Sequence, residues 1–201
     1  MRRLVFATNN GYKLQEVREL LDGVVEVVGL GEVGLSGEIP ETADTLEGNA
    51  LLKAAWVWER THMDCFADDT GLEVEALNGA PGVFSARYAG PRCSFDDNVD
   101  KLLAAMEGKS DRKADFRTVI CLMEKGVPRF FEGRVEGQIL TERCGSGGFG
   151  YDPVFMPDRF AVSFAEMPLE VKNRISHRGL AVAKLVDYLR NGEFFKVKGK
   201  N

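Results

Sequence analysis

The sequence predicts a mixed α/β fold, a twisted sheet with flanking helices, and two local patterns support it. Near the N-terminus, a short apolar run at 4–7 is followed by the polar turn 8–11 and then by apolar residues at helical spacing. Further on, strand-like runs at 117–123 and 130–140 flank a turn at 125–128, which is typical of an antiparallel hairpin. A strand that leads into a helix, together with a hairpin, indicates a sheet with both kinds of pairing.

The N-terminal third continues with a short strand, a long loop and a helix. The strand is expected at 24–28, and the Gly- and Glu-rich segment 29–44 is expected to form an exposed loop. The helix should begin near Asp44 or Thr45, because Glu47 stands three residues after Asp44, as in a capping box. Inward-facing residues are predicted at Leu14, Val17, Leu20 and Leu21 in the first helix and at Leu46, Ala50, Ala54 and Val57 in the second.

Two short strands are predicted on either side of the acidic pair Asp68-Asp69. Residues 65–67 are apolar, and residues 72–77 alternate as a half-exposed strand does. We therefore expect the pair to lie in a turn between these strands.

The chain after residue 93 is predicted to contain two capped helices and a glycine-rich loop at 145–152. Ser94 with Asp97 can cap the first helix, and Ser176 can cap the last helix, which should end at 191–192. Inward-facing residues are predicted at Leu102, Leu103 and Met106 in the first and at Leu180, Ala183, Val186 and Leu189 in the last.

Composition indicates one globular domain that spans residues 1–201. With 44% hydrophobic and 28% charged residues, the chain can bury a core without disulfides or a metal. Its formal net charge of −5 disfavours nucleic acid as a partner, because duplex binding relies on many cations that neutralise phosphates. A small anionic ligand needs only a few local cations, and the sequence offers them at Lys13, Lys53, Lys172 and Arg178.

Cysteines and histidines limit the possible metal chemistry. The four cysteines are far apart and form no C-x-x-C pair, so we interpret them as reduced core residues: Cys65, Cys93, Cys121 and Cys144. The two histidines, His62 and His177, are not part of an H-E-x-x-H motif. A bound metal should therefore be a hard cation with oxygen ligands.

The sequence contains no pattern that predicts export or membrane insertion. The apolar run 4–7 is far shorter than the core of a signal peptide, and no later stretch is long and apolar enough to cross a bilayer. We expect a cytoplasmic protein without a membrane partner.

Residues 8–13 are candidates for binding phosphate. They lie where a strand is expected to enter a helix, and a helix N-terminus offers unpaired N–H groups and partial positive charge. Lys13 adds a full positive charge. The spacing is not that of a Walker A loop, and a polar cap that only stabilises the helix is the alternative.

Asp68 and Asp69 are candidates for holding a metal. Adjacent carboxylates between apolar strands are costly to place near a core unless a cation or hydrogen bonds compensate them. Mg²⁺ is the simple compensation, because it takes one or two protein carboxylates and completes its shell with waters and substrate phosphates. Glu38, Glu41 or Asp44 can add a further carboxylate. The alternative is an Asx turn and cap at a strand end.

Two later segments are candidates for binding a base. Residues 145–153 combine glycines, which let a ligand approach the backbone, with Phe149 and Tyr151, which can stack on a base. His177 and Arg178 begin a helix and carry donors that suit a purine edge. The alternatives are a tight loop with Phe149 in the core and a solvated helix start.

Together these segments resemble the inosine/xanthosine triphosphate pyrophosphatase family, over a span from Leu4 to about Leu189. Six motifs carry the resemblance in order: ATNNGYK at 7–13, EGNALLKA at 47–54, ADDTGL at 67–72, GAPGVFSARY at 79–88, GFGYDP at 148–153 and KNRISHR at 172–178. Two departures keep the needed groups, since Thr70 stands where a Ser is common in the family and Asn9 where a Gly is common.

The resemblance implies two lobes around a long sheet with the active cleft between them, a homodimer, and Mg²⁺-dependent hydrolysis of ITP, dITP and XTP to the monophosphate and pyrophosphate. It implies that Asp69 and Lys13 are catalytic, with Asp69 as the general base, and that Asp69, Asp68 and Glu41 hold the metal. The implied substrate contacts are Thr8, Asn9, Asn10, Gly11, Tyr12, Lys13, Lys53, Thr70, Phe149, Gly150, Tyr151, Asp152, Lys172, His177 and Arg178.

The residue chemistry suits this reaction. Attack of water on phosphorus in a polyanion needs charge neutralisation, which Mg²⁺ and lysines supply, and a carboxylate that orients or deprotonates the water. Two other readings use the same pocket: a general nucleotide pyrophosphatase and a nucleotide sensor without turnover. A single-stranded nucleic acid binder would show a basic surface, which the acidic composition disfavours.

Overall fold

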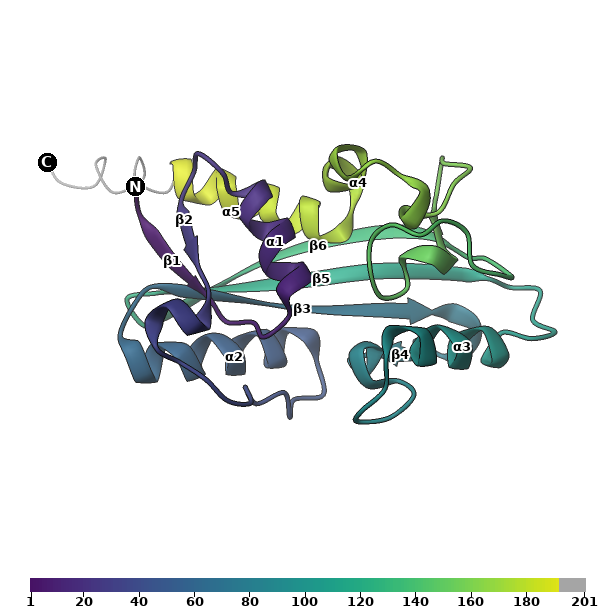
Figure 1. Cartoon of the computed structure of the whole chain (residues 1–201), viewed down its shortest axis with the longest axis horizontal. Helices are drawn as coiled ribbons and strands as arrows, with labels where there is room; N and C mark the ends of the chain where they lie inside the picture. Colours follow the sequence, from purple (N-terminus) through teal and green to yellow (C-terminus); the bar gives the residue numbers. More distant parts are fainter. Residues whose placement is uncertain (192–201) are drawn as a thin grey trace, which may run out of the picture. The chain divides into compact units, whose positions relative to one another are not determined.

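A computed structural model describes residues 1–191 of the chain (Figure 1). In this part of the chain a seven-stranded sheet has the order β2-β1-β3-β5-β6-β7, and β4 pairs with β3. Strand β1 is parallel to β2 and to β3, whereas the pairs β3–β4 and β6–β7 are antiparallel. The mixed sheet predicted from the sequence is therefore confirmed.

The strands are β1 (Arg3–Phe6), β2 (Glu26–Val28), β3 (Cys65–Val74), β4 (Pro81–Gly82), β5 (Lys113–Glu124), β6 (Val127–Ile139) and β7 (Phe155–Pro157). The α-helices within the described residues are α1 (Gly11–Leu20), α2 (Leu46–Thr61), α3 (Phe95–Ala105), α4 (Leu169–Ile175) and α5 (His177–Asn191). The sequence patterns did not predict β4, β7 and α4, because elements this short show too few periods to be recognised.

The described chain forms two compact units. Within the described residues, the first unit comprises Met1–Asp69, Val119–Gly133 and 179–191, and the second comprises Thr70–Thr118 and Arg134–Arg178. Strands β3, β5 and β6 each contribute residues to both units.

In the first unit, successive side chains of β3 point to opposite faces of the sheet, and different helices cover these two faces. Phe66 belongs to a buried cluster with Val17 of α1 and Ala181 of α5. The neighbouring Cys65 points to the other face, where its Sγ donates a hydrogen bond to the carbonyl oxygen of Ala54 in α2 at 3.2 Å. Figure 1 accordingly shows α1 and α5 on one side of the sheet and α2 on the other. Side chains that alternate along β3 therefore reach different helices.

The core of the second unit is built around Phe116 of β5. Its ring meets Phe155 of β7 edge-on, with ring centroids 4.8 Å apart, and packs near Phe164 at 6.2 Å. Helix α3 covers this unit and begins as predicted, because Ser94 and Asp97 form a reciprocal capping box.

Helix α2 begins one residue later than the pair Asp44 and Glu47 would require. Thr45 is the N-cap, and its Oγ1 accepts a hydrogen bond from the backbone N–H of Gly48 at 3.0 Å. The cap thus falls on the second of the two predicted starting residues, and the Asp44–Glu47 capping box is not used. The predicted inward face is confirmed, since each of its members is at most 2% exposed: Leu46, Ala50, Ala54 and Val57.

The acidic pair Asp68-Asp69 lies within one continuous strand, so the prediction of a turn between two strands was wrong. Strand β3 runs from Cys65 to Val74, and the side chains of both aspartates are buried. Burial is possible because each carboxylate meets an ammonium group on its own face of the strand, Lys13 for Asp68 and Lys53 for Asp69.

Helix α5 faces inward with a different phase from the predicted one. Arg178 is buried, and the residues three, four and seven positions later are buried with it: Ala181, Val182 and Leu185. The predicted Leu180 and Ala183 are exposed, while Val186 and Leu189 pack partly against the core. The polar start of the helix sets this phase, which an apolar pattern alone does not reveal. The helix is described as far as Asn191, and the predicted stop residue Gly192 lies outside the described residues.

The hairpin between β5 and β6 is tighter than the sequence suggested. Lys125 and Gly126 alone form the turn, with φ of 51° and 79°. Two consecutive residues with positive φ are typical of a type I′ turn, whose twist matches that of the flanking strands. As a result β5 extends to Glu124 and β6 begins at Val127. At its other end β5 begins at Lys113, four residues earlier than predicted.

The cysteines divide into two kinds. All four thiols are free. Cys65 and Cys121 are buried, whereas Cys93 and Cys144 are half-buried, so the prediction of core cysteines is confirmed only for Cys65 and Cys121.

No helix among residues 1–191 combines the length and apolar character that a bilayer crossing requires.

Candidate active site

The start of α1 is organised by Asn10, which caps the helix. Its Oδ1 accepts hydrogen bonds from the backbone N–H groups of Tyr12 and Lys13 at 3.0 and 3.2 Å, and Thr8 Oγ1 accepts one from the N–H of Asn10 at 3.1 Å. These two helical N–H groups already have a protein acceptor. Positive charge for an anion therefore comes mainly from the Lys13 ammonium and the helix dipole.

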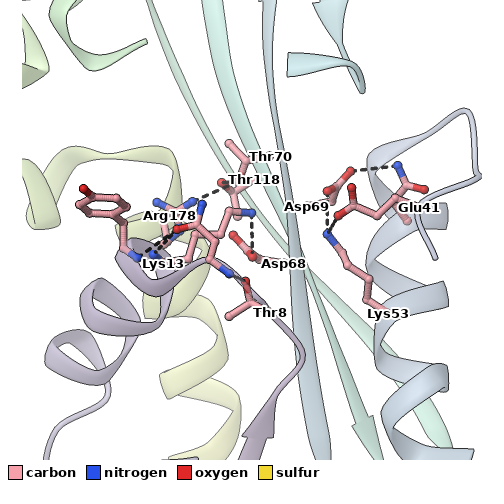
Figure 2. Close-up of polar contacts among 12 residues, drawn as sticks. Thr8, Lys13, Glu41, Lys53, Asp68, Asp69, Thr70, Thr118 and Arg178 are labelled. Atoms are coloured by element: carbon pink, nitrogen blue, oxygen red, sulfur yellow. Dashed lines mark hydrogen bonds and ion pairs between the residues drawn. The ribbon is translucent and has the colours of Figure 1, made fainter. Parts of the chain in front are cut away.

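Lys13 reaches from α1 to Asp68 on the same face of β3 (Figure 2). The Nζ–Oδ1 distance is 3.0 Å, and the side chains are 15% and 2% exposed. The first residue of the acidic pair, Asp68, therefore faces the α1 side of the strand.

The turn before α1 also contacts the loop that follows β2, because the Asn9 side-chain amide donates to the carbonyl oxygen of Gly37 at 3.0 Å.

Asp69 points to the opposite face, toward α2 (Figure 2). Lys53 Nζ donates to Asp69 Oδ1 at 2.8 Å, and Asn49 Nδ2 donates to Asp69 Oδ2 at 3.2 Å. Asn49 and Lys53 are four residues apart in the helix, and such residues lie one above the other on the same face. One face of α2 therefore holds both oxygens of a single buried carboxylate.

Glu41 brings a second carboxylate to Lys53. Lys53 Nζ donates to Glu41 Oε1 at 2.6 Å, and the Lys53 side chain is 6% exposed. Of the three loop acids proposed from the sequence, Glu41 is thus joined to the Asp69 cluster, whereas Glu38 and Asp44 are exposed.

Burial and charge act in opposite directions in this cluster. Burial lowers the pKa of Lys53, but the carboxylates of Asp69, Glu41 and Asp68 outweigh it, so the pKa of Lys53 is raised and the ammonium stays charged. Burial raises the pKa of Asp69, and the ammonium groups of Lys53 and Lys13 oppose this increase only in part. Asp69 is consequently more basic than an exposed aspartate.

Asp69 and Glu41 offer oxygen donors of the kind that a hard divalent cation prefers. Among residues 1–191 no group of three His, Cys, Asp or Glu side chains converges on one point, and Asp68 faces the other side of the strand. Asp69 and Glu41, however, converge on the Lys53 ammonium, which shows that this pair can surround a positive charge. Two carboxylates are what Mg²⁺ typically takes from a protein when waters and phosphates complete its shell. The residues present fit Mg²⁺.

In the second unit, Asp152 organises the end of the glycine-rich loop. Its Oδ2 accepts hydrogen bonds from the backbone N–H of Phe149 and from Lys172 Nζ, both at 2.8 Å. The side chains of Asp152 and Lys172 are each 4% exposed. Because a buried ion pair with these hydrogen bonds tolerates little movement, it fixes the loop to α4.

Phe149 is half-buried and lies beside two cations. Lys172 Nζ is 5.3 Å and Arg178 Cζ 5.5 Å from the centroid of its ring, and the ring of Phe95 is 5.8 Å away. The alternative that Phe149 lies in the core is therefore excluded. A partly exposed aromatic ring beside hydrogen-bond donors suits a flat heterocycle that carries acceptor atoms.

His177 and Arg178 are buried at the start of α5, with exposed fractions of 4% and 3%, so neither is part of a solvated helix start. The His177 ring stacks on Phe116 at 4.4 Å. Arg178 Nη2 donates to Thr70 Oγ1 at 3.4 Å, and the Thr70 hydroxyl shares a 2.7 Å hydrogen bond with that of Thr118 (Figure 2). These groups fix the guanidinium of Arg178 in one place.

The glycines of the loop make room for the protein itself. A Cβ at Gly147 would lie 2.8 Å from the carbonyl oxygen of Ala165, and one at Gly148, where φ is +69°, would collide with the Asp152 carboxylate. The sequence suggested that these glycines admit a ligand, but they allow close packing of the loop. A Cβ at Gly150 would meet nothing within 4 Å, so Gly150 is the position of the motif with open space.

Tyr151 differs from Phe149 in its surroundings. Its side chain is 5% exposed within the core of the second unit, and its hydroxyl donates to the carbonyl oxygen of Ser85 at 2.8 Å. The Tyr151 ring therefore serves the fold, and Phe149 is the aromatic residue of the loop that is open to a base.

Asn49 and Thr118 belong to these clusters and were not singled out from the sequence. Asn49 lies among the apolar residues of the α2 face, four positions before Lys53, and a polar residue on an inward face is a usable signal. Thr118 is fully buried at the start of an apolar run, where nothing local distinguishes it from a β-branched core residue.

The two clusters differ in chemistry. The first unit holds a buried, basic carboxylate that is paired with the Lys53 ammonium, and the neighbouring Asp68 pairs with a second ammonium on the other face of the strand. This arrangement suits the activation of water near a polyanion. The second unit presents an aromatic face beside buried cationic donors, which suits an acceptor-rich ring. The chain is thus a mixed α/β protein with one cluster suited to a polyanion and a separate cluster suited to a heterocycle.

The chain belongs to the Ham1 family, whose model matches residues 4–188. A protein of Porphyromonas gingivalis named dITP/XTP pyrophosphatase is 60% identical over 190 residues, which cover 94% of this chain and 98% of that protein. The solved structure of a HAM1 protein from Coxiella burnetii superposes with a TM-score of 0.87 at 40% identity, over 95% of this chain and 100% of that one. The Staphylococcus aureus Ham1 protein gives a TM-score of 0.86 at 36% identity, with the same coverage.

Proposed function

We propose that this chain hydrolyses the deaminated purine nucleoside triphosphates ITP, dITP and XTP to the nucleoside monophosphate and pyrophosphate, and so cleanses the nucleotide pool. The name of the relative from Porphyromonas gingivalis, at 60% identity, supports this substrate class. The structural observation that carries the proposal is the buried Asp69 carboxylate, which Lys53 and Asn49 hold at both oxygens while Glu41 meets the same ammonium.

Asp69 is proposed as the general base. It takes a proton from the water whose oxygen attacks the α-phosphorus, the bond from that phosphorus to the oxygen bridging the α- and β-phosphates breaks, and pyrophosphate leaves. The raised pKa of Asp69 makes it a better proton acceptor than an exposed aspartate. Lys13 and Lys53 neutralise charge on the phosphates, which is the main requirement of phosphoryl transfer.

Mg²⁺ is proposed as the cofactor. When bound, it would neutralise phosphate charge and lower the pKa of a bound water. Asp69 and Glu41 would hold it, since both already converge on a cation. Asp68, which the resemblance implies as a further metal carboxylate, contributes by holding Lys13 on the other face of β3.

The purine base is proposed to lie against Phe149. Lys172, His177 and Arg178 supply donors for O6 and N7 of hypoxanthine or xanthine, both of which are acceptors. We retain the other substrate contacts implied by the resemblance as part of this proposal: Thr8, Asn9, Asn10, Gly11, Tyr12, Thr70, Gly150, Tyr151 and Asp152.

Release of pyrophosphate from a nucleotide panel tests the proposal. ITP, dITP, XTP, GTP and ATP are incubated with the protein, with and without Mg²⁺. We expect release from ITP, dITP and XTP only when Mg²⁺ is present. Equal rates on all five nucleotides would indicate a general nucleotide pyrophosphatase instead, and binding without release would indicate a sensor.

We also propose that the chain is a homodimer that acts in the cytoplasm, where free nucleotides are made and consumed. The family resemblance supports the dimer. Light scattering on the purified protein gives the mass in solution, and a mass of one chain would contradict the dimer.

A further inference from the structure

Asn49 connects two parts of the first unit through one buried side chain. Its amide is 1% exposed, and its Nδ2 donates to Asp69 Oδ2 at 3.2 Å. On its other side, Asn49 Oδ1 accepts a hydrogen bond from the backbone N–H of Ala43 at 2.9 Å. Ala43 lies two residues after Glu41 in the chain, so the amide joins the Asp69 carboxylate to the loop that carries Glu41.

The loop is seated tightly on the same turn of α2. A Cβ at Gly48 would lie 2.6 Å from the Cβ of Ala43, so only glycine allows this approach. Thr45 caps this turn, because its Oγ1 accepts a hydrogen bond from the N–H of Gly48. Independent contacts therefore hold Ala43 and the neighbouring Glu41 at a set distance from α2.

We propose that Asn49 is a positioning residue that sets the Asp69 and Glu41 carboxylates around one cation. The inference rests on the function proposed above, in which that cation is the metal. Lys53 contacts one oxygen of each carboxylate. This contact by itself would still let the Asp69 carboxylate rotate about its side-chain bonds. The donor on Oδ2 removes that freedom, and the acceptor for Ala43 fixes the second carboxylate through the backbone.

Direct binding of Mn²⁺ without nucleotide, followed by electron paramagnetic resonance, tests the inference independently of turnover. Asn49→Leu keeps the size of the side chain and removes both hydrogen bonds. We expect its Kd for Mn²⁺ to rise ~10–100-fold, the usual effect of losing a hydrogen-bond partner of a metal-ligating side chain. Gly48→Ala leaves the Asp69 bond intact and displaces Ala43, so it should also weaken Mn²⁺ binding.

Asn98 offers a matched control in the second unit. It is also a buried amide near the start of a helix, with Oδ1 accepting from the N–H of Ala89 at 2.8 Å and Nδ2 donating to the carbonyl oxygen of Ala86 at 3.2 Å. Asn98→Leu should lower thermal stability as Asn49→Leu does. It should leave the Kd for Mn²⁺ unchanged.

Kinetics on ITP add a second measurement. Asn49→Leu should lower kcat by ~10–100-fold with a smaller change in KM, because the phosphates and base keep their contacts. Should Asn49→Leu fail to fold, Asn49→Asp retains the acceptor for Ala43 and loses the donor to Asp69, and its kcat should fall likewise. A folded Asn49 variant with the Mn²⁺ affinity and kcat of the parent would overturn the inference. If the Asn49 variants bind Mn²⁺ more weakly as expected but the parent protein releases no pyrophosphate from ITP, the proposed function is overturned and the positioning role stands.

Discussion

Asp68 and Asp69 are consecutive residues of β3, yet their carboxylates are held by lysines of different helices, Lys13 of α1 and Lys53 of α2. The alternation of side chains along a strand sends them to opposite faces. Their contributions to the proposed reaction should therefore differ, although both are buried acids in the same motif.

Asp69→Asn should lower kcat by at least ~10²-fold, because a general base typically contributes about 10²–10⁴-fold and the metal also depends on this carboxylate. Asp68→Asn removes the negative charge that faces Lys13 and leaves Asp69 and Glu41 in place, so it should change KM more than kcat. Initial rates on ITP at saturating Mg²⁺ measure both variants, and circular dichroism checks the fold. Turnover near that of the parent in Asp69→Asn would refute its role.

Lys13→Ala should lower kcat/KM for ITP by about 10–10²-fold, which corresponds to the loss of one hydrogen bond to a charged group. Since Asn10 already takes the N–H groups of Tyr12 and Lys13, the ammonium is the main positive group at this end of α1. Lys184→Ala is the control, because Lys184 is exposed on α5 and donates to the carbonyl oxygen of Glu132. Identical kinetics for both variants would place the phosphates elsewhere.

Removal of divalent metal should abolish activity. EDTA treatment followed by desalting should leave no pyrophosphate release, and excess Mg²⁺ should restore it. Zn²⁺ should serve poorly, because the pair Asp69 and Glu41 offers only oxygen ligands. Undiminished hydrolysis after exhaustive chelation would exclude the metal-dependent mechanism.

Local elements of this fold are predictable from the sequence because their signals are local. The Ser94–Asp97 capping box, the inward face of α2 and the hairpin near Lys125 depend on residues close in sequence. The turn expected at Asp68-Asp69 was wrong for the opposite reason. The cations that allow these acids to lie in a strand come from positions 55 and 16 residues away, which no local pattern reveals.

The candidate site shows the same limit. Motif resemblance proposed Asp69, Lys53 and Arg178. Asn49 was overlooked although it is a polar residue on an inward helix face, and Thr118 became visible only as the partner of Thr70 in space. The phase of α5 was missed because buried polar residues, including Arg178, occupy the face that an apolar pattern would assign to the core. Buried polar residues break the apolar pattern, so sequence periodicity is least reliable where they lie.

The two kinds of cysteine should differ in reactivity. Burial raises the pKa of both the Cys65 and Cys121 thiols to about 12, so at pH 8 only about one in 10⁴ is ionised and able to react. Treatment of the native protein with a thiol-specific disulfide reagent should modify Cys93 and Cys144 alone, as identified by peptide mass spectrometry. The other two thiols should react after unfolding in guanidinium, and their rapid reaction in native protein would contradict the described packing.

Arg178→Ala should lower kcat/KM for ITP by ~10–10³-fold, equivalent to the loss of one or two charge-assisted hydrogen bonds. It should also reduce the ratio of kcat/KM for ITP to kcat/KM for ATP. Arg178 is buried, its Cζ lies 5.5 Å from the centroid of Phe149, and Thr70 anchors it. Its donors suit the O6 and N7 acceptors of hypoxanthine, whereas the N6 amino group of adenine would face a donor and leave both groups unpaired.

Arg174→Ala is the matched control for this prediction, because Arg174 is exposed on α4 and pairs with Glu170 of the same helix. Arg174→Ala should leave kcat/KM for both ITP and ATP unchanged, since an exposed helical ion pair adds little even to stability. Measuring ITP and ATP on the parent and both variants separates the possible roles of Arg178. A loss for ITP that greatly exceeds the loss for ATP indicates a contact with the base. An equal loss for the two nucleotides would contradict that contact, because their triphosphates are the same and only the base distinguishes them.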